Sequence, residues 1–345
     1  MDSRLSVRIA YYTGWLMPEM EGISKEVFTL AKHFNSTIIG ISNLQPIKID
    51  FKNRVFGFST RWYYCSRILS FLMSKIHTIN HIYDSLDNWL YLSSIFSKKT
   101  ILTGVVGNGL LPLTYYQRLN FLVVDSEERR NELIQKGFKK ERIKLIYPGL
   151  NLNPFLNVPY PMSIRPFRVL FASSPPTTEE LESRGVFDLL EAAENLPDVE
   201  FIFLWRPWGD SLQRVKDEIE KRNLENICLI CEKVVDVRKF YKKCHIAVAP
   251  FKKNGGKSCP TFVIESLASG RPVILGPGVG IKRLIQEANV GLYYNKGSEL
   301  SEKIQILRDN WGKFAHFARE FAKEFFSINK FVDKYQQLYE RVLDE

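Results

Sequence analysis

Short apolar runs rich in β-branched and aromatic residues alternate along this chain with longer segments of helical periodicity. In the first half, strands are expected at VRIAYYT (7–13), STIIGIS (36–42), INHIYDS (79–85), KTILTGVV (99–106), FLVVDS (121–126) and IKLIYPG (143–149). Helical patterns cover Ser24 to Phe34 and residues 61–76, and further helical stretches separate most of the later strands. This alternation predicts βαβ units around a parallel sheet.

A proline-rich break follows at NLNPFLNVPYPMSIRP, which has neither helical nor strand periodicity and is typical of a linker. The alternation then restarts, with strands expected at 167–173, 199–205, 226–231, 245–251, 272–275 and 291–294, and helices at 185–195, 211–222 and 260–268. Amphipathic helices continue through Val342. The pattern therefore predicts an α/β fold of two Rossmann-like, doubly wound domains. Ligands of such folds bind at the carboxyl ends of the strands, so we expect a cleft between the two sheets.

Length and composition agree with this organisation. A chain of 345 residues suggests about two domains, and 45% hydrophobic with 25% charged residues is typical of a globular protein. The formal net charge of +10 suits an anionic partner: a nucleic acid, an acidic membrane surface or a phosphorylated substrate. The sequence contains no helix-turn-helix, RNP or zinc-finger pattern, which argues against nucleic acid.

The cysteines indicate a reducing compartment. They are Cys65, Cys228, Cys231, Cys244 and Cys259, an odd number spread widely through apolar surroundings. Cys228 and Cys231 form a CxxC within an expected strand, and because no second pair follows, we interpret them as core residues and not as zinc ligands. There is no signal-like apolar segment and no run of about 18 apolar residues. We expect a cytoplasmic protein that does not span a membrane.

The stretch APFKKNGGKSCPTFVIESLASGRPVILGPGVGIKRLI (249–285) carries the richest chemistry. A strand ends there, a basic loop with Lys252, Lys253 and Lys257 follows, and a helix begins near Pro260. The free N–H groups of Thr261 and Phe262 at the helix start favour a phosphate. Glu265 lies one turn further on, where its carboxylate could accept hydrogen bonds from both hydroxyls of a ribose. An ordinary βα junction with a solvated lysine loop remains the alternative at this point.

The segment IESLASGRPVIL resembles the donor-site signature of family 4 retaining glycosyltransferases, in which a second glutamate precedes a small-residue helix, a glycine and Pro-Val. The resemblance implies that Glu265 binds the nucleotide ribose. Residues 184–205 resemble the family's Lys-Gly-helix-strand unit, with Arg184 where a lysine usually grips the diphosphate. Residues 20–34 resemble its first glycine loop, which Gly22 matches.

Two further segments, 126–155 and 325–343, resemble the end of the family's N-terminal domain and its terminal helix. The resemblance thus implies the GT-B fold. It consists of an acceptor-side Rossmann-like domain over residues 1–155, a nucleotide-sugar-binding domain over 156–325, and a C-terminal helix over 326–345 that packs back on the first domain.

The sequence also departs from the family pattern. Lys257 occupies the place of the first glutamate, eight residues before Glu265. The family's Gly-Arg after the first strand of the second domain is replaced by Ser173 and Ser174, and Arg206 could supply the missing charge. The histidine often found in the first domain has no counterpart in the glycine-rich segment Gly104 to Gly109. Any transfer therefore uses a variant site.

The resemblance implies a hexosyltransferase-like enzyme that moves a sugar from a nucleoside-diphosphate donor to a glycan, lipid-linked or small-molecule acceptor. We expect retention of configuration, with no metal and no cofactor besides the donor, because cations and the helix start would stabilise the leaving diphosphate. Arg184 and Lys257 are the expected catalytic residues. The expected donor-binding residues are Gly22, Ser174, Arg184, Arg206, Lys257, Pro260, Thr261, Phe262 and Glu265. A catalytically degenerate partner subunit and, less favoured, a sugar-nucleotide epimerase remain as alternatives.

The segment RWYYCSRILSFLMSKI (61–76) is amphipathic and combines basic residues with Trp62, Tyr63 and Phe71. Its basic residues are Arg61, Arg67 and Lys75. The pattern is compatible with peripheral contact with an anionic membrane surface, which would place the protein at the cytoplasmic face of a membrane. A helix that packs on the core with snorkelling basic ends is the favoured interpretation. The single histidines His77, His81, His245 and His316 lie in apolar contexts and are expected to be structural.

Overall fold

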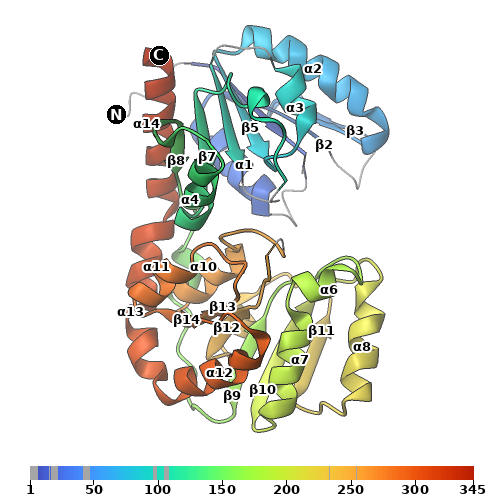
Figure 1. The fold of residues 1–345 in the computed structure, drawn as a ribbon, viewed down its shortest axis with the longest axis vertical. Coiled ribbons are helices and arrows are strands. Elements are labelled where there is room, and N and C mark those ends of the chain that lie inside the picture. Colours follow the sequence, from blue (N-terminus) through green and yellow to red (C-terminus); the bar gives the residue numbers. More distant parts are fainter. Residues whose placement is uncertain are drawn as a thin grey trace. The chain divides into compact units, whose positions relative to one another are not determined.

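The protein consists of two compact units in the computed structural model, which describes residues 7–14, 16, 22–41, 47–95, 99–104, 109–232, 234–253 and 255–345 (Figure 1). The first unit comprises Met1–Gly149 together with Ile328–Glu345, and the second comprises Leu150–Ser327. The chain therefore passes from one unit to the other twice, and Leu150 and Ser327 form a β-bridge where the two passages lie side by side.

The first unit is built around a sheet that is eight-stranded within the described residues, in the order β3-β4-β2-β1-β5-β6-β7-β8. The strands are β1 Ile9–Thr13, β2 Ser36–Ile41, β3 Ile47–Asp50, β4 Val55–Phe58, β5 Ile79–Asp84, β6 Thr100–Gly104, β7 Phe121–Val124 and β8 Ile143–Leu145. The helices are α1 Gly22–His33, α2 Tyr63–Ile76, α3 Trp89–Ser94, α4 Glu127–Gln135 and α14 Ile328–Asp344. The pairings from β4 to β8 are parallel, and β3 pairs antiparallel with β4 at one edge. The predicted βαβ organisation is confirmed.

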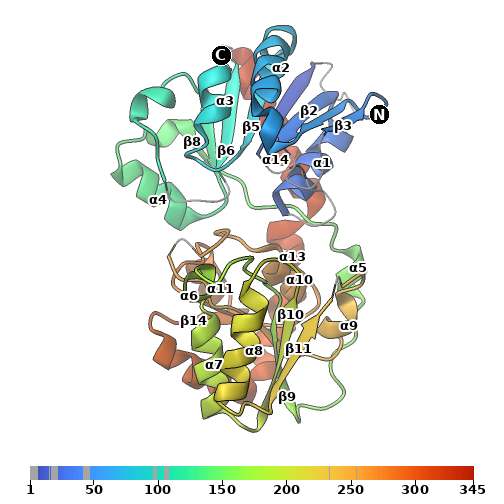
Figure 2. The same cartoon turned by 90° about the vertical axis from the view of Figure 1, so that its right-hand side faces the viewer.

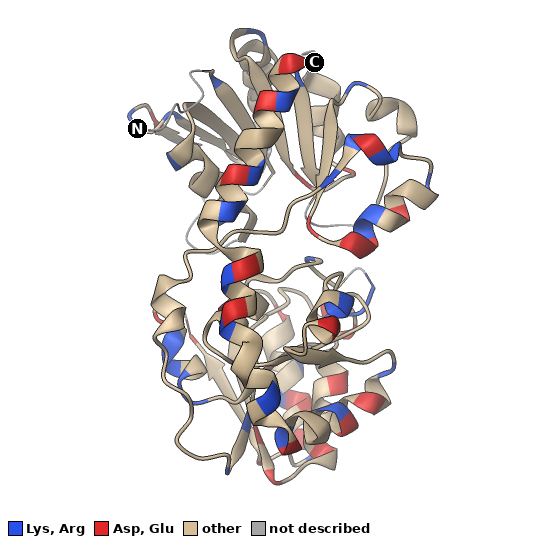
Figure 3. Ribbon diagram, turned by 90° about the vertical axis from the view of Figure 1, so that its left-hand side faces the viewer, with Lys and Arg blue, Asp and Glu red and all other residues tan. Residues whose placement is uncertain are grey.

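The C-terminal helix α14 belongs to the core of the first unit. Its apolar residues recur every three or four positions, and Phe331, Val332, Tyr335, Leu338, Tyr339 and Val342 are all buried in one core cluster. The hydroxyl of Tyr339 lies 3.0 Å from that of Tyr11 and 2.8 Å from Nδ1 of His81. Charged residues of α14 lie on its other face, where Figure 3 shows blue and red segments along the helix.

The second unit contains a parallel sheet that is six-stranded within the described residues, in the order β11-β10-β9-β12-β13-β14. Its strands are β9 Phe167–Phe171, β10 Val199–Trp205, β11 Ile227–Cys231, β12 Ile246–Ala249, β13 Val273–Leu275 and β14 Gly291–Tyr293. Its helices are α5 Asn153–Leu156, α6 Glu180–Ser183, α7 Val186–Asn195, α8 Ser211–Lys221, α9 Arg238–Tyr241, α10 Thr261–Ala268, α11 Lys282–Glu287, α12 Leu300–Asp309 and α13 Trp311–Phe326. Helices cover both faces of the sheet (Figure 2), as the doubly wound prediction requires.

The order of this second sheet creates a topological switch point. The chain runs from β9 outward through β10 to β11, then returns to β12 on the other side of β9 and runs outward to β14. The loops that follow β9 and β12 therefore leave in opposite directions, which opens a crevice at their carboxyl ends. The residues expected to bind the donor diphosphate follow these strands.

The proline-rich linker packs on the second unit through two arginines, one buried and one half-buried. Arg271 is fully buried, and its guanidinium donates to backbone carbonyls that include Pro159 O, at 2.5 Å, and Cys244 O, at 3.3 Å. Burial lowers the pKa of Arg271 to about 10. Arg319 donates to Val158 O, and its guanidinium lies over the ring of Tyr160, 4.3 Å from the centroid. Residues 158–160 of the linker are thus bound to the rest of the second unit.

Some sequence-based expectations differ from the structure. Strands β3 and β4 were not predicted, because each is only four residues long and Gly57 interrupts the apolar pattern of the second. Cys228 is exposed and Cys231 half-buried, so the prediction that both are core residues is wrong. The physical reason is that β11 is an edge strand, whose outer side no neighbouring strand covers.

The four histidines that were expected to be structural do not all have the same environment. His77, His81 and His245 are buried and hydrogen-bonded, as predicted. Burial lowers the pKa of each, to about 3 for His81. His316, which was also expected to be structural, is exposed on α13.

Helix α2 also differs, in the direction of its apolar face. The favoured interpretation had its apolar residues packing on the core. In the structure Tyr63, Leu69 and Met73 do pack there, but Tyr64, Ile68, Leu72 and Ile76 are exposed.

Candidate functional site

The helix start expected to bind phosphate is present at the carboxyl end of β12. Pro260 is the N-cap of α10, with extended backbone (φ −71°, ψ 136°), and Thr261 is the first helical residue. The N–H of Val263 donates to Pro260 O at 3.1 Å. Thr261 is half-exposed and Phe262 is buried. The N–H groups of this first turn, with the positive end of the helix dipole, form a favourable position for an anion.

Glu265 is held in place by a tyrosine that the sequence analysis did not single out. The hydroxyl of Tyr241, at the end of α9, donates to Glu265 Oε2 at 3.1 Å and to Phe262 O at 2.9 Å. Burial and the nearby Glu265 carboxylate raise the pKa of Tyr241 well above its usual range, so its hydroxyl stays protonated. Glu265 itself is half-exposed. Tyr241 thus orients the Glu265 carboxylate.

Arg184 lies close to the start of α10. Its guanidinium stacks over the ring of Phe251, 5.2 Å from the centroid, and the ring of Phe251 lies 6.2 Å from that of Phe262. Arg184 Nη1 donates to Ser173 Oγ at 3.3 Å, and Nη2 lies 3.4 Å from Glu180 Oε2. The loop after β9, the start of α7 and the loop after β12 therefore meet at this arginine.

Arg206 and Ser174 form a second group one strand further along the sheet. The guanidinium of Arg206 lies over the ring of Trp208, 4.9 Å from the centroid, and the indole of Trp208 donates to Ser174 O at 3.1 Å. Arg206 is exposed. The loops after β9 and β10 are thus joined. Arg206 follows β10 directly, and Arg184 contacts the loop after β9 through Ser173.

The lysine-rich loop does not act as one positive patch. Lys252 is paired with Glu182 and, at 3.1 Å, with Asp188 Oδ1. Burial alone lowers the pKa of Lys252, but its bonds to the two carboxylates raise it more. The charge of Lys252 is therefore neutralised where it lies, and this lysine adds little attraction for an anion. Lys253 is exposed and Lys257 is half-buried.

Asp188 belongs to a buried network that sequence reasoning missed. Its other oxygen, Oδ2, accepts from the hydroxyl of Tyr294 at 3.1 Å, and the same hydroxyl lies 3.3 Å from Pro250 O. Asp188, Tyr294 and Lys252 come from three distant parts of the chain. Together they attach the loop after β12 to the first turn of α7.

Glycines allow these loops to approach closely. Gly185 precedes α7 with left-handed backbone (φ 68°), and a Cβ there would lie 2.0 Å from Pro250 O. A Cβ on Gly278 would lie 2.0 Å from Lys252 O. Only glycine fits at such positions. Arg184 thus supplies a cation, and the close approach of the next residue, Gly185, to Pro250 holds this part of the chain in place.

The first unit has its own switch point between β1 and β5. Gly14 N, Ser85 N and the amide of Asn88 all donate to Asp84 at the end of β5, and burial raises the pKa of Asp84 to about 6. Gly22 is the first residue of α1, half-exposed; residues 17–21 of its loop lie outside the described residues. So do residues 105–108 of the segment Gly104 to Gly109.

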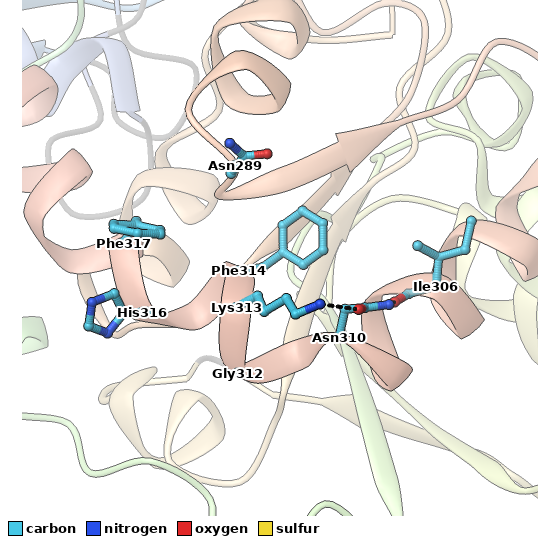
Figure 4. Close-up of a pocket in the computed structure, with 8 residues that line it drawn as sticks. All are labelled: Asn289, Ile306, Asn310, Gly312, Lys313, Phe314, His316 and Phe317. Carbon is cyan, nitrogen blue, oxygen red and sulfur yellow. Dashed lines mark hydrogen bonds between the residues drawn. The ribbon is translucent and has the colours of Figure 1, made fainter.

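A metal site is not formed by the residues that the structure describes: none of their His, Cys, Asp and Glu side chains gather in groups of three or more. A surface pocket of about 690 Å³ lies elsewhere, between α12, α13 and the turn after α11 (Figure 4). Phe314, Phe317 and Asn289 line it, and Lys313 Nζ donates to Asn310 Oδ1 at 3.3 Å. It contains none of the predicted site residues.

Residues 180–325 match the family described as "Glycosyl transferases group 1". No relative is found among curated protein sequences.

Solved structures resemble the whole chain. A glycosyltransferase from Rickettsia africae ESF-5 superimposes with a TM-score of 0.75 at 18% identity, covering 98% of this chain and 99% of the other. The Anabaena protein Alr3699/HepE, in complex with UDP-glucose, gives a TM-score of 0.77 at 14% identity over 97% and 100% of the two chains. Sucrose-phosphate synthase from Thermosynechococcus elongatus gives 0.72 at 13% identity over 98% and 99%. The chain therefore has the two-domain fold of the GT-B glycosyltransferases, and the matched residues 180–325 lie in its second unit.

Proposed function

We propose that the protein transfers a sugar from a nucleoside-diphosphate donor to an acceptor, with retention of configuration and without a metal. The observation that carries the proposal is the start of α10. An anion-binding turn lies beside Arg184, across the ring of Phe251, and a half-exposed, oriented carboxylate follows at Glu265. This arrangement suits a diphosphate joined to a ribose. The match of residues 180–325 to group 1 glycosyltransferases supports it.

The chemistry follows from charge. As the bond between sugar and diphosphate breaks, negative charge develops on the leaving phosphate, and fixed cations and N–H dipoles lower the barrier. Arg184, the first turn of α10, Lys257 and Arg206 would supply this stabilisation. Glu265 would bind the two ribose hydroxyls and so orient the diphosphate toward the helix start. Glycan and lipid-linked acceptors are both compatible with this half of the site.

Calorimetry against UDP-, GDP- and ADP-sugars, followed by a product assay, tests the proposal. Anabaena Alr3699/HepE was solved with UDP-glucose, so UDP-sugars are the first candidates. We expect the sugars of one nucleotide to bind. Even without an acceptor, the bound sugar should be transferred slowly to water, which releases the nucleoside diphosphate. Absence of binding by all three classes would refute the proposal.

A degenerate partner subunit is the second candidate, because Lys257 occupies the position at which the family pattern has its first glutamate. In an active transferase, by contrast, Lys257 would serve the donor site, because it is half-buried and lies three residues before Pro260, the N-cap of α10, whereas the charge of Lys252 is neutralised by Glu182 and Asp188. We propose that Lys257 contacts either the donor diphosphate, in place of the arginine missing at Ser174, or a carboxylate on an acidic sugar.

Lys257→Glu separates the two candidates. If Lys257 serves an active site, the variant should weaken binding of the native donor, because a carboxylate replaces a cation beside an anion. A gain of transfer from a neutral nucleotide-sugar over an inactive parent would instead show a degenerate transferase. Lys253→Glu, in the same loop and exposed, is the control for the change in net charge.

A further inference from the structure

The outward face of α2 reverses the usual polarity of a surface helix. Ser66, Ser70 and Ser74 follow one another at intervals of four and are buried toward the unit. Two residues further along a helix is a rotation of about 200°. The residues offset by two, Tyr64, Ile68, Leu72 and Ile76, therefore lie on the opposite side, and they are 54–61% exposed. An ordinary surface helix buries its apolar stripe and exposes its serines.

Two of the three buried serines explain how this orientation is tolerated. Ser70 Oγ donates to Ser66 O at 2.7 Å, and Ser74 Oγ donates to Phe71 O at 2.7 Å, so both hydroxyls are satisfied within the helix. Small side chains let the helix approach the sheet closely. What remains exposed is a row of apolar side chains that recur every four residues from Tyr64 to Ile76, on a helix face that no described element covers (Figures 1 and 2). Exposed apolar patches of this kind mark interaction sites.

The charge around this face has one sign. No aspartate or glutamate occurs between Asp50 and Asp84, whereas that stretch contains Lys52, Arg54, Arg61, Arg67 and Lys75. Arg61 and Lys75 are exposed at the two ends of the helix. The guanidinium of Arg67 lies over the ring of Trp89 on the neighbouring α3, 5.4 Å from the centroid. The partner of this surface must therefore be both apolar and anionic.

We propose that the outward face of α2 is a docking surface for an anionic lipid bilayer, on which the helix lies in the interface plane. An apolar helix face flanked by basic residues, with Trp62, Tyr64 and Trp89 exposed beside it, matches the chemistry of the headgroup region. A second copy of the chain fits less well, because a two-fold contact would place this positive face against itself. The described residues contain no helix that could cross a membrane, so the attachment is peripheral. The proposal does not depend on sugar transfer.

Flotation of the full chain with phosphatidylcholine vesicles, with and without phosphatidylglycerol, tests the proposal. The wild type should float with the anionic vesicles, and added salt should release part of it. Ile68→Ser with Leu72→Ser should lower the partition coefficient at least about tenfold, because two side chains no longer enter the acyl boundary. Arg61→Gln with Lys75→Gln should lower it about fivefold per cation, on anionic vesicles only.

Matched controls keep the result interpretable. Met162→Ser with Val235→Ser removes two apolar side chains that are fully exposed on the second unit, and it should leave flotation unchanged. All substituted residues are exposed, so melting temperatures should stay close to that of the wild type. Failure of the wild type to float at low salt would overturn the proposal. The proposal would also be overturned if the double variant Ile68→Ser with Leu72→Ser floated as well as the wild type. A third contrary outcome is that neither of these two proteins binds vesicles, while the wild type forms a concentration-dependent dimer that the double variant does not form.

Discussion

Replacing Glu265 by glutamine removes one charge from the proposed ribose site. The two side chains have the same shape, and the Tyr241 hydroxyl, 3.1 Å from Oε2, can donate to the amide oxygen of the glutamine. Folding stability should therefore change by less than about 0.5 kcal/mol. The amide nitrogen, however, cannot accept a hydrogen bond, so one ribose hydroxyl loses its acceptor. A lost bond to a charged group of this kind costs about 1.5–3 kcal/mol, which is roughly a 10- to 150-fold rise in Kd.

Calorimetry with the nucleotide that the wild type binds most tightly measures this loss. The matched control is Glu191→Gln, an exposed glutamate on α7, which should bind like the wild type. A 2′,3′-dideoxy form of the nucleotide completes a double-mutant cycle. The wild type should bind the dideoxy form more weakly, and Glu265→Gln should add little to that loss. If Glu265→Gln binds every nucleotide as the wild type does, or loses equal affinity for the dideoxy form, the assignment of Glu265 to the ribose is wrong.

Two further predictions concern stability. Gly185→Ala should destabilise the second unit by about 2–4 kcal/mol, because the new Cβ would lie 2.0 Å from Pro250 O in left-handed backbone; Gly312→Ala, where a Cβ meets nothing within 4 Å, should be neutral or stabilising in the same denaturant titration. Burial lowers the pKa of His81 from 6.5 to about 3, so the unfolded chain takes up a proton that the folded protein does not, and stability should fall as the pH drops below 6.5, by about 2 kcal/mol at pH 5. His81→Gln should be less stable at pH 7.5 but should lose less between pH 7.5 and 5; an unchanged pH slope would contradict the assignment.

The sequence by itself determined the architecture and part of the site. Alternation of apolar runs with helical periods identified most strands and both sheets, because burial in a parallel sheet leaves a local signature in every strand. Pro260 marked the beginning of α10 within one residue, since a proline's fixed φ and missing N–H are tolerated at a helix start. Four positions further on, Glu265 is one turn from that start for the same local reason.

The tertiary structure alone decided which groups cooperate and which surface is free. Tyr241 and Glu265 are 24 residues apart, so no local pattern could predict that Tyr241 orients the Glu265 carboxylate. Asp188 and Tyr294 are 106 residues apart, and their contact, like the pairing of Asp188 with Lys252, arises only in the folded protein. Helix α2 shows the same limit. Its periodicity predicted an apolar stripe, but a stripe has no direction until the helix is packed, and here the small, internally hydrogen-bonded serines allow the other side to face the sheet. Burial is a property of the neighbours that folding brings, and periodicity records only the spacing along one element.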